Sequence, residues 1–310
     1  MITIYKNNEL GLVTLDEPTA GCWINVINPT HEELARLEKF NIPLDYMTYA
    51  LDLDERPRTE RENGDMLIIL RIPFYQGRGA DIPFTTLPLG IIFTPDHLVT
   101  VCKMENEILS DFASGKIRSL STSKRQRFVL RLLLLTANRY LSHLREITKV
   151  VDALEDQLQL STRNKEVLEL LKYQKSLTYF TTALKSNELM MERLDRIRIF
   201  QAYPEDEDLL DDVLTENQQA IEMTNITSNI LSSMMDAFAS IISNNLNGVM
   251  KILAALTIIV ALPGTVGTFF GMNVPLPLSD TNPYSFLWIL AISLSLSAIA
   301  TYIFHRRDWF

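Results

Sequence analysis

The chain has 310 residues, room for about two domains, and 22% of them are charged. The formal net charge of −9 argues against nucleic acid as a partner and is compatible with handling cations. Cys22 and Cys102 stand far apart and match no metal-binding spacing, which predicts ordinary buried thiols in a reducing compartment. No basic segment leading into a long apolar run opens the chain, so we expect no signal peptide and a cytoplasmic N-terminal part.

The first 120 residues have the pattern of a mixed α/β domain. Thr30 precedes Glu32 and Glu33, which is typical of a helix N-cap followed by acidic residues in the first turn. Residues 92–101, interrupted by Thr94-Pro95-Asp96, predict a hairpin. Short β-rich runs separated by polar turns lie at residues 12–14, 22–26, 66–70, 90–93 and 98–101.

Long helices are expected next. Apolar residues recur at helical spacing from Lys124 to Ile199, with a polar interruption at residues 161–165, which predicts two antiparallel helices joined by a short loop. The first of them is rich in basic residues: Lys124, Arg125, Arg127, Arg131, Arg139, Arg145 and Lys149. An acidic cluster follows later in the chain: Glu205, Asp206, Glu207, Asp208, Asp211, Asp212 and Glu216. The basic face is either solvated or paired with these acids, within one subunit or between subunits.

Residues 209–273 predict one helix of roughly 60 residues, too long for a single globular core. It begins among acidic residues, lacks Gly and Pro until Gly248 and then becomes wholly apolar. Its middle part has apolar residues at steps of three and four: Met223, Ile226, Ile230, Met234, Phe238 and Ile241. Polar residues fill much of the rest: Thr227, Ser233, Ser240, Ser243, Asn244, Asn245 and Asn247. We expect the polar residues to face a central water column and the apolar ones to face neighbouring subunits.

Two uncharged stretches, residues 252–270 and 286–304, each match the roughly 20 residues that cross a bilayer core. Lys251 precedes the first stretch and His305-Arg306-Arg307 follows the second, whereas the connection between them has no Lys or Arg. The positive-inside rule then places both termini in the cytoplasm of a cell-membrane protein. The expected parts are a cytoplasmic α/β domain at 1–120, antiparallel helices at 121–203, a stalk helix at 204–250, a pore-lining transmembrane helix at 251–272, an extracellular loop at 273–285, a second transmembrane helix at 286–304 and a cytoplasmic basic tail at 305–310.

Two membrane helices are too few to surround a polar path, so a chain that moves a solute must form a ring of copies. The first span has small residues that permit close helix packing, and Pro263 interrupts one backbone hydrogen bond. The small residues are Gly264, Gly267, Gly271, Ala254, Ala255 and Ala261.

Gly271-Met272-Asn273 ends the first span and is followed by a short loop, a second span and a basic, aromatic C-terminus. With the tripeptide in this position, the chain resembles the CorA family of magnesium transporters. Further matches along the chain are DAFASIISNNLNGVMKIL at 236–253, WINVINP at 23–29, and DERPRTE at 54–60 running into LIILR at 67–71. The fold class that we expect is an α+β cytoplasmic domain with a long stalk helix and two transmembrane helices.

The resemblance implies a funnel-shaped homopentamer in the lipid membrane that passes Mg²⁺, with no organic cofactor and no enzymatic activity. It assigns Gly271, Met272 and Asn273 to a selectivity filter that meets the hydrated ion. By the same resemblance, Met250 and Leu253 correspond to an apolar gate, and Asn247 and Asp236 to polar positions of the pore. Asp212 corresponds to a residue that binds regulatory divalent cations between subunits, with Asp81 and Asp96 as candidate partners.

Two departures from the family pattern concern the outer mouth. Phe270 stands where the family has a tyrosine, and the loop at 274–280 lacks the acidic pattern common in relatives, which weakens the concentration of cations there. Magnesium is still favoured, because Mg²⁺ keeps its waters and a ring of Asn amides can accept hydrogen bonds from them. Neither span contains His or Cys to suit zinc or copper.

Two alternatives remain. One is the same fold carrying another divalent cation (zinc, cobalt or nickel), with or without proton coupling. The other is a membrane-anchored scaffold or sensor that conducts nothing. The four histidines are scattered, and no phosphate loop, zinc-protease helix or nucleophile elbow is found.

Overall fold

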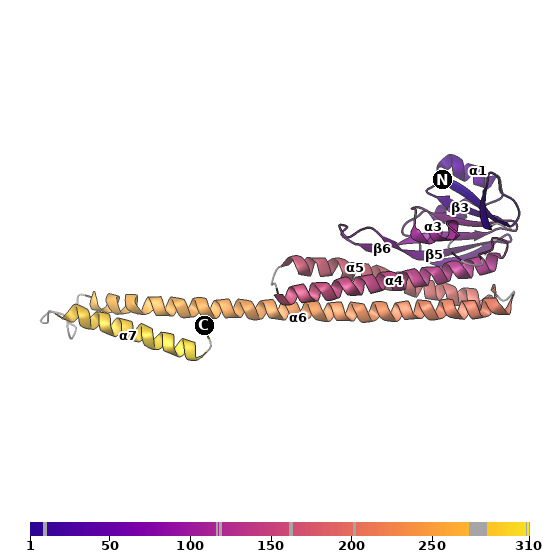
Figure 1. Ribbon diagram of the computed structural model, residues 1–310. Helices are drawn as coiled ribbons and strands as arrows, with labels where there is room; N and C mark the ends of the chain where they lie inside the picture. The colour runs from indigo at the N-terminus through magenta and orange to yellow at the C-terminus, as the bar shows by residue number, and fades with distance from the viewer. Residues whose placement is uncertain are drawn as a thin grey trace. The chain divides into compact units, whose positions relative to one another are not determined.

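The computed structural model describes residues 1–8, 11–115, 117, 120–160, 164–200, 203–272, 284–307 and 309. The chain divides into two units, Met1–Met235 and Asp236–Phe310. The unit Met1–Met235 contains a sheet and the helices that cover it. The unit Asp236–Phe310 contains two helical segments. Figure 1 labels the elements of both units.

A seven-stranded sheet forms the centre of the first unit, in the order β2-β1-β3-β7-β6-β5-β4 among the described residues. Only β3 and β7 run parallel, and the other neighbours are antiparallel. The strands are β1 (Ile2–Asn8), β2 (Gly11–Leu15), β3 (Trp23–Ile27), β4 (Arg58–Glu62), β5 (Asp65–Tyr75), β6 (Phe84–Phe93) and β7 (Leu98–Cys102). Five of them contain the runs predicted from sequence, and β6 and β7 form the predicted hairpin.

The sheet is buried on both faces, because residues of opposite pleat enter different cores. In β5, Ile68, Leu70 and Ile72 belong to one hydrophobic cluster, whereas Leu67 and Ile69 belong to the other. This alternation follows from the period of two in a strand. Helices α1 (His31–Glu38) and α2 (Leu44–Tyr49) supply the cluster on one face, and α3 to α6 supply the cluster on the other.

Helix α1 begins as its sequence predicts. The Thr30 side chain accepts a hydrogen bond from the Glu33 backbone, and the Glu33 carboxylate accepts one from the Thr30 backbone. This capping box satisfies two amides that would otherwise lack partners. Helix α2 ends against the sheet at Ala50, where a Cβ added to Gly90 would lie 2.4 Å from the Ala50 Cβ. Only glycine therefore fits at position 90.

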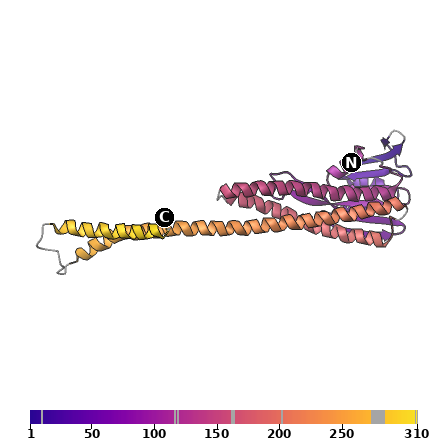
Figure 2. The same cartoon turned by 60° about the horizontal axis from the view of Figure 1, so that its bottom comes forward.

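Helices α4 (Arg125–Leu160) and α5 (Asn164–Arg196) are the predicted antiparallel pair. Helix α3 (Glu107–Ala113) packs on α4. Figures 1 and 2 show α4, α5 and the first part of α6 (Pro204–Phe270) side by side. The predicted long helix is confirmed as α6, with 67 residues.

The first part of α6 packs on its neighbours through a three-four repeat. The buried positions of the repeat are Asp206, Leu210, Val213, Asn217, Ala220, Thr224, Thr227, Leu231 and Met234, and Ile221 beside them is buried as well. The expected assignment of faces is therefore wrong in part. Thr227, assigned to the polar residues, is buried and donates to the Met223 carbonyl at 2.9 Å, and Met234, expected to face a neighbouring subunit, is buried within the chain. Ile226 and Ile230 are exposed, which agrees with residues that face another copy. A threonine can occupy a buried position because its hydroxyl finds an acceptor one turn back in its own helix.

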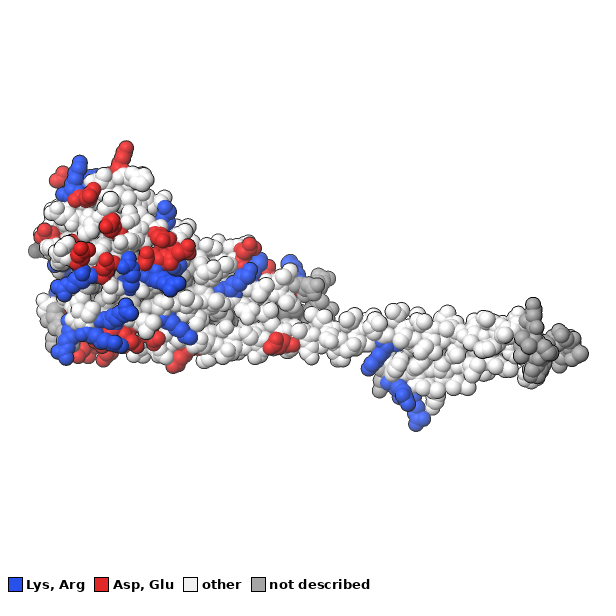
Figure 3. Space-filling model, turned by 180° about the vertical axis from the view of Figure 1, so that it is seen from behind, with Lys and Arg blue, Asp and Glu red and all other residues white. Residues whose placement is uncertain are grey.

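The second unit consists of the last part of α6 and α7 (Ser285–Arg306), both long and apolar enough to cross a membrane. Figure 3 shows that the surface of this helix pair is almost free of charge, with Lys and Arg gathered toward one end. The observed elements confirm the expected α+β unit, long helix and two apolar C-terminal helices.

Candidate functional site

Helix α7 covers one face of α6 in the second unit. The α6 positions of this unit with reduced exposure include Gly248, Ala255, Ile259, Leu262, Pro263, Val266 and Phe270. Those of α7 are mostly small, with Ser293 buried and Ser297 and Ala300 half-buried. Small residues allow two membrane helices to approach closely, where van der Waals packing and hydrogen bonds hold them together.

A hydrogen bond joins the two helices at the point where α6 lacks one of its own. Pro263 has no N–H, so the Ile259 carbonyl one turn earlier loses its helical donor. The Ser297 hydroxyl of α7 donates to that carbonyl at 3.2 Å. The Ile259 carbonyl, which has no helical donor because of Pro263, therefore has a hydrogen-bond partner in α7. A carbonyl in an apolar medium requires such a partner.

A different face of α6 carries a continuous row of exposed polar and small residues, which we name the α6 line. Its members follow one another at alternating steps of four and three. They are Asp236, Ser240, Ser243, Asn247, Met250, Ala254, Thr257, Ala261, Gly264, Thr268 and Gly271. At 100° per residue, this row is set roughly 100–200° around the axis from the positions covered by α7. Other exposed positions of the same segment carry large apolar side chains, among them Leu256, Val260 and Phe269.

The structure places three of the expected pore residues, Asp236, Asn247 and Met250, on the α6 line. The fourth, Leu253, comes three residues after Met250 and is exposed on the adjoining part of the same face. The threonine hydroxyls of the line donate to carbonyls one turn back in the helix, Thr257 to Leu253 at 2.8 Å and Thr268 to Gly264 at 2.8 Å. Their remaining lone pairs stay available on the exposed face.

Helix α6 tightens at its end, where the expected filter begins. The Gly271 amide donates both to Gly267 O at 3.0 Å and to Thr268 O at 3.2 Å. Met272 follows with its side chain exposed. Asn273, the third expected filter residue, lies outside the described residues.

The acidic start of α6 pairs in part with the basic helix α4. Asp206 is buried and accepts from Arg127 Nε at 2.6 Å, and exposed Glu205 accepts from the same guanidinium at 2.9 Å. These bonds raise the pKa of Arg127. Pairing within the subunit, one of the two interpretations of the basic face, is therefore confirmed for Arg127.

Asp212, the candidate regulatory residue, is exposed. Among the described residues it forms no side-chain hydrogen bond or ion pair, and Asp81 and Asp96 are likewise exposed. No group of three or more His, Cys, Asp or Glu residues in the described part of the chain is arranged to hold a metal ion. The described part of one chain thus supplies Asp212 with no second ligand.

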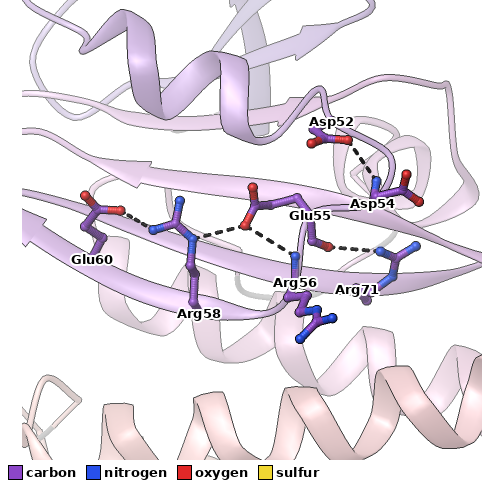
Figure 4. A network of polar contacts seen from close by, with 7 residues as sticks. All are labelled: Asp52, Asp54, Glu55, Arg56, Arg58, Glu60 and Arg71. Carbon is purple, nitrogen blue, oxygen red and sulfur yellow. Dashed lines mark hydrogen bonds and ion pairs between the residues drawn. The ribbon is translucent and has the colours of Figure 1, made fainter.

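The DERPRTE segment forms an internal network instead of a cation site (Figure 4). Glu55 accepts from Arg58 Nε at 3.1 Å, and Arg58 also pairs with Glu60 and lies 4.7 Å above the Tyr49 ring. Arg71 from β5 donates to the Glu55 carbonyl at 2.9 Å and so fixes the loop to the sheet. Glu55 and Glu60 of this segment are thus both paired with Arg58, and their role is structural.

The WINVINP segment is also structural. Trp23 is fully buried and stacks on Tyr5 with ring centroids 4.8 Å apart. Its indole N–H donates to Thr100 at 2.8 Å, and Thr100 donates to Asn25 at 3.0 Å. Cys22 and Cys102 are buried free thiols, as predicted, and burial raises the pKa of both.

Comparison with known proteins gives concordant matches over nearly the whole chain. The family model described as CorA-like Mg²⁺ transporter protein matches residues 19–306. The cobalt/magnesium transport protein CorA of Methanocaldococcus jannaschii is 30% identical, and the alignment covers 100% of this chain and 99% of that protein. The complete structure of the CorA magnesium transporter from the same organism superposes with a TM-score of 0.86 at 27% identity, covering 100% of this chain and 99% of the other.

More distant likenesses concern the fold alone. The cytoplasmic domain of ZntB from Vibrio parahaemolyticus aligns with 78% of this chain and 98% of that domain, with a TM-score of 0.57 and 13% identity. The family model spans β3 to α7, and the relative at 30% identity spans the whole chain, so both include the long helix and the two apolar segments. The chain belongs to the family of CorA-like Mg²⁺ transporter proteins.

Proposed function

We propose that this protein transports divalent cations across the membrane, and that it passes hydrated Mg²⁺ along a path lined by the α6 line. One observation carries the proposal: on a helix of membrane-spanning character, the exposed row opposite α7 is polar or small at every position except Met250. Within the apolar stretch the row consists of Ala254, Thr257, Ala261, Gly264 and Thr268, and toward the N-terminus it continues as Asn247, Ser243, Ser240 and Asp236. A continuous row of small and polar residues suits a border with water or protein better than one with lipid. In a homopentamer whose α6 helices surround an axis, the α6 line of each copy faces a water-filled path along that axis.

The choice of Mg²⁺ rests on the chemistry of the row. Its ligands are amide, hydroxyl and backbone oxygens, with a carboxylate only at Asp236. Mg²⁺ dehydrates reluctantly, and such neutral groups can hydrogen-bond to its water shell without displacing it. The name of the M. jannaschii relative, a cobalt/magnesium transport protein, agrees with this choice. Asn273 with the Gly271 and Met272 backbone completes the filter in this proposal.

The gate is the apolar pair Met250 and Leu253. A ring of these exposed side chains closes a narrow path by excluding water from it. Cytoplasmic Mg²⁺ held between subunits by Asp212 and an acid of a second copy favours the closed ring, because the cation offsets the repulsion between carboxylates. Helix α6 contains both Asp212 and the gate, so one element couples them.

Both termini lie in the cytoplasm in this proposal. The basic residues of the second unit, Lys251, Arg306 and Arg307, flank the two apolar stretches on the side of the expected cytoplasmic tail. A cavity of about 520 Å³ lined by Lys251, Asn245 and Trp309 supports this, since it brings the C-terminal segment beside the start of the apolar part of α6. Positive charge at one end of a helix pair favours the cytoplasmic leaflet.

Ion uptake into liposomes tests the proposal. Wild-type protein should admit Mg²⁺, while Asn273→Ala abolishes uptake and Asn247→Ala reduces it. Asn245→Ala, an exposed asparagine two residues before Asn247 and off the α6 line, should leave uptake unchanged. Zinc uptake without magnesium uptake would overturn the choice of ion, and no uptake of any divalent cation would favour a non-conducting scaffold.

In the same assay, Asp212→Ala should weaken inhibition by Mg²⁺ on the cytoplasmic side. Unchanged inhibition would remove Asp212 from the regulatory site.

A further inference from the structure

A cavity of about 500 Å³ in the first unit has an unusual concentration of positive charge. It is lined by Arg61 of β4, by Lys124 directly before α4, and by Arg125 and Arg127 in the first turn of α4. The only carboxylate among its described lining residues is Asp206. This arrangement stands out in a chain whose net charge is −9.

Most of this charge is not neutralised within the described part of the chain. Arg127 is paired with Asp206 at 2.6 Å and with Glu205 at 2.9 Å. Arg125 donates to the neutral carbonyl of Thr94 and keeps its charge. Among the described residues no carboxylate lies within 4.0 Å of the Arg61 or Lys124 cationic group. Three positive charges therefore remain available.

The Tyr203 ring holds two of the cations toward one another. The Lys124 ammonium lies 5.5 Å and the Arg127 guanidinium 5.8 Å from its centroid. Cation–π attraction to the ring partly offsets the repulsion between the two groups.

The cations at the start of α4 occupy positions where positive charge is unfavourable. The start of a helix carries positive partial charge, and acids there are stabilising whereas cations are not. Helix α4 has 36 residues and no acid in its first turn, and it begins with Arg125 and Arg127 directly after Lys124. A local arrangement that lowers stability without a partner is expected where function requires it.

We propose that this cavity binds a soluble anion that carries two or more phosphates, of the size of a nucleoside triphosphate. Its volume lies within the range of small-molecule sites, about 300–1,000 Å³. Three unneutralised cations match the charge of a di- or triphosphate better than that of a single monovalent anion. The first-turn amides of α4 supply further donors of the kind that hold phosphate oxygens. The proposal is independent of which ion the protein transports.

Calorimetric titration of the full-length protein in detergent tests it, with EDTA present and at about 0.15 M ionic strength. Pyrophosphate and ATP should bind saturably and raise the Tm, orthophosphate should bind more weakly, and adenosine should not bind. Arg61→Ala and Lys124→Ala should each weaken ATP binding by about tenfold, the effect of losing 1.4 kcal/mol. Lys185→Ala removes an exposed lysine of the same unit outside the cavity and should leave the affinity unchanged.

Two further variants separate a binding site from a folding defect. Arg61→Lys and Lys124→Arg keep the charge and should restore most of the affinity. Absence of saturation with both ATP and pyrophosphate overturns the proposal, and so does an equal loss of affinity in Lys124→Ala and Lys185→Ala, which would reveal attraction to the whole surface. If adenosine binds as tightly as ATP, the phosphate assignment is wrong.

Discussion

Arg71 shows how a single residue of β5 is fixed by side chains from two helices. Its backbone N–H and its backbone carbonyl both bind side chains of these helices. The Asn187 amide of α5 donates to that carbonyl at 2.8 Å and accepts from the Arg71 N–H at 3.0 Å. The Tyr140 hydroxyl of α4 donates to the same carbonyl at 3.0 Å. Buried side chains of α4 and α5 thus satisfy the backbone groups of this β5 residue.

Replacing Asn187 by Ala should lower the free energy of unfolding by about 2–3 kcal/mol, because the Arg71 N–H loses its acceptor and the Arg71 carbonyl keeps only the Tyr140 donor. Thermal or denaturant unfolding of the solubilised protein measures the change. Lys185→Ala, on the exposed side of the same helix, is the control and should change it by less than about 0.5 kcal/mol. Equal effects of the two substitutions would show that the hydrogen bonds of Asn187 to the Arg71 backbone do not stabilise the fold.

His143 is a buried histidine of α4 that faces Phe84 with ring centroids 5.2 Å apart. Desolvation by burial lowers its pKa from 6.5 to about 4, and Arg139 adds to the decrease while Glu107 opposes it. Glu105, Glu107, Asp111 and Arg139 are the charged groups that line the cavity beside it, which has about 620 Å³. The folded protein thus keeps His143 neutral where the unfolded chain would protonate it.

Stability should therefore fall as the pH drops from about 6.5 to about 4, since the unfolded state binds the proton and the folded state does not. His143→Phe should remove up to about 3 kcal/mol of that loss. Unfolding curves at a series of pH values measure it, and His31→Gln, at an exposed histidine, should keep the wild-type slope. A wild-type slope in His143→Phe would mean that other groups cause the acid sensitivity.

At the scale of elements, the association of α6 with α7 depends on few polar contacts. Ser297 donates to the carbonyl that Pro263 leaves without a helical partner, and most of the neighbouring contacts are between small or apolar residues. In a membrane such a hydrogen bond has no competing water, although measured values remain modest. The serine thus compensates for the proline of the facing helix.

Ser297→Ala should weaken the α6–α7 contact by about 0.5–1.5 kcal/mol. Unfolding in mixed micelles measures the loss, with Ser295→Ala, at an exposed position of α7, as the matched control. In Pro263→Ala, which restores the helical donor, removal of the Ser297 hydroxyl should cost much less. An unchanged cost in that background would contradict the proposed pairing of Ser297 with the proline site.

The sequence predicted those elements whose signals are local, and it failed where tertiary contacts decide. The cap at Thr30, the β6–β7 hairpin and the α4–α5 pair follow from turn residues and periodicity. Strand β4 was missed because its residues, RTERE, carry charges that suit an edge strand paired on one side only. Thr224 and Thr227 were not recognised as buried because the pattern of apolar residues alone does not contain them.

At the scale of the whole molecule, the α6 line was only partly predictable. The polar and small residues of the apolar segment were visible in the sequence, but their alignment into one exposed row opposite α7 depends on which face α7 covers. The row begins at Asp236 and ends at Gly271, and the described part of a single chain offers it no partner. The second ligand of the Asp212 site was not predictable because it requires a second copy in our proposal.

Met250 is the large apolar residue of the α6 line. Met250 interrupts the polar positions with an exposed apolar side chain. In a ring of copies these side chains exclude water when the path is closed. High Mg²⁺ on the cytoplasmic side of the protein favours the closed path in our proposal. In liposomes under this condition, Met250→Ser should hydrate the closed path and raise the rate at which Mg²⁺ leaks across the membrane. A barrier lowered by 1.4 kcal/mol corresponds to about a tenfold faster leak.

Val249→Ser is the matched control, because Val249 is equally exposed and apolar but lies about 100° around the helix from Met250. Its leak should stay at the wild-type level, since a position beside the row contributes little to the water exclusion. If both variants leak equally, the substitutions loosen the helices in general. If neither leaks, the barrier lies elsewhere along the row, and the same pair of measurements at Leu253 and its neighbour Ile252 would locate it.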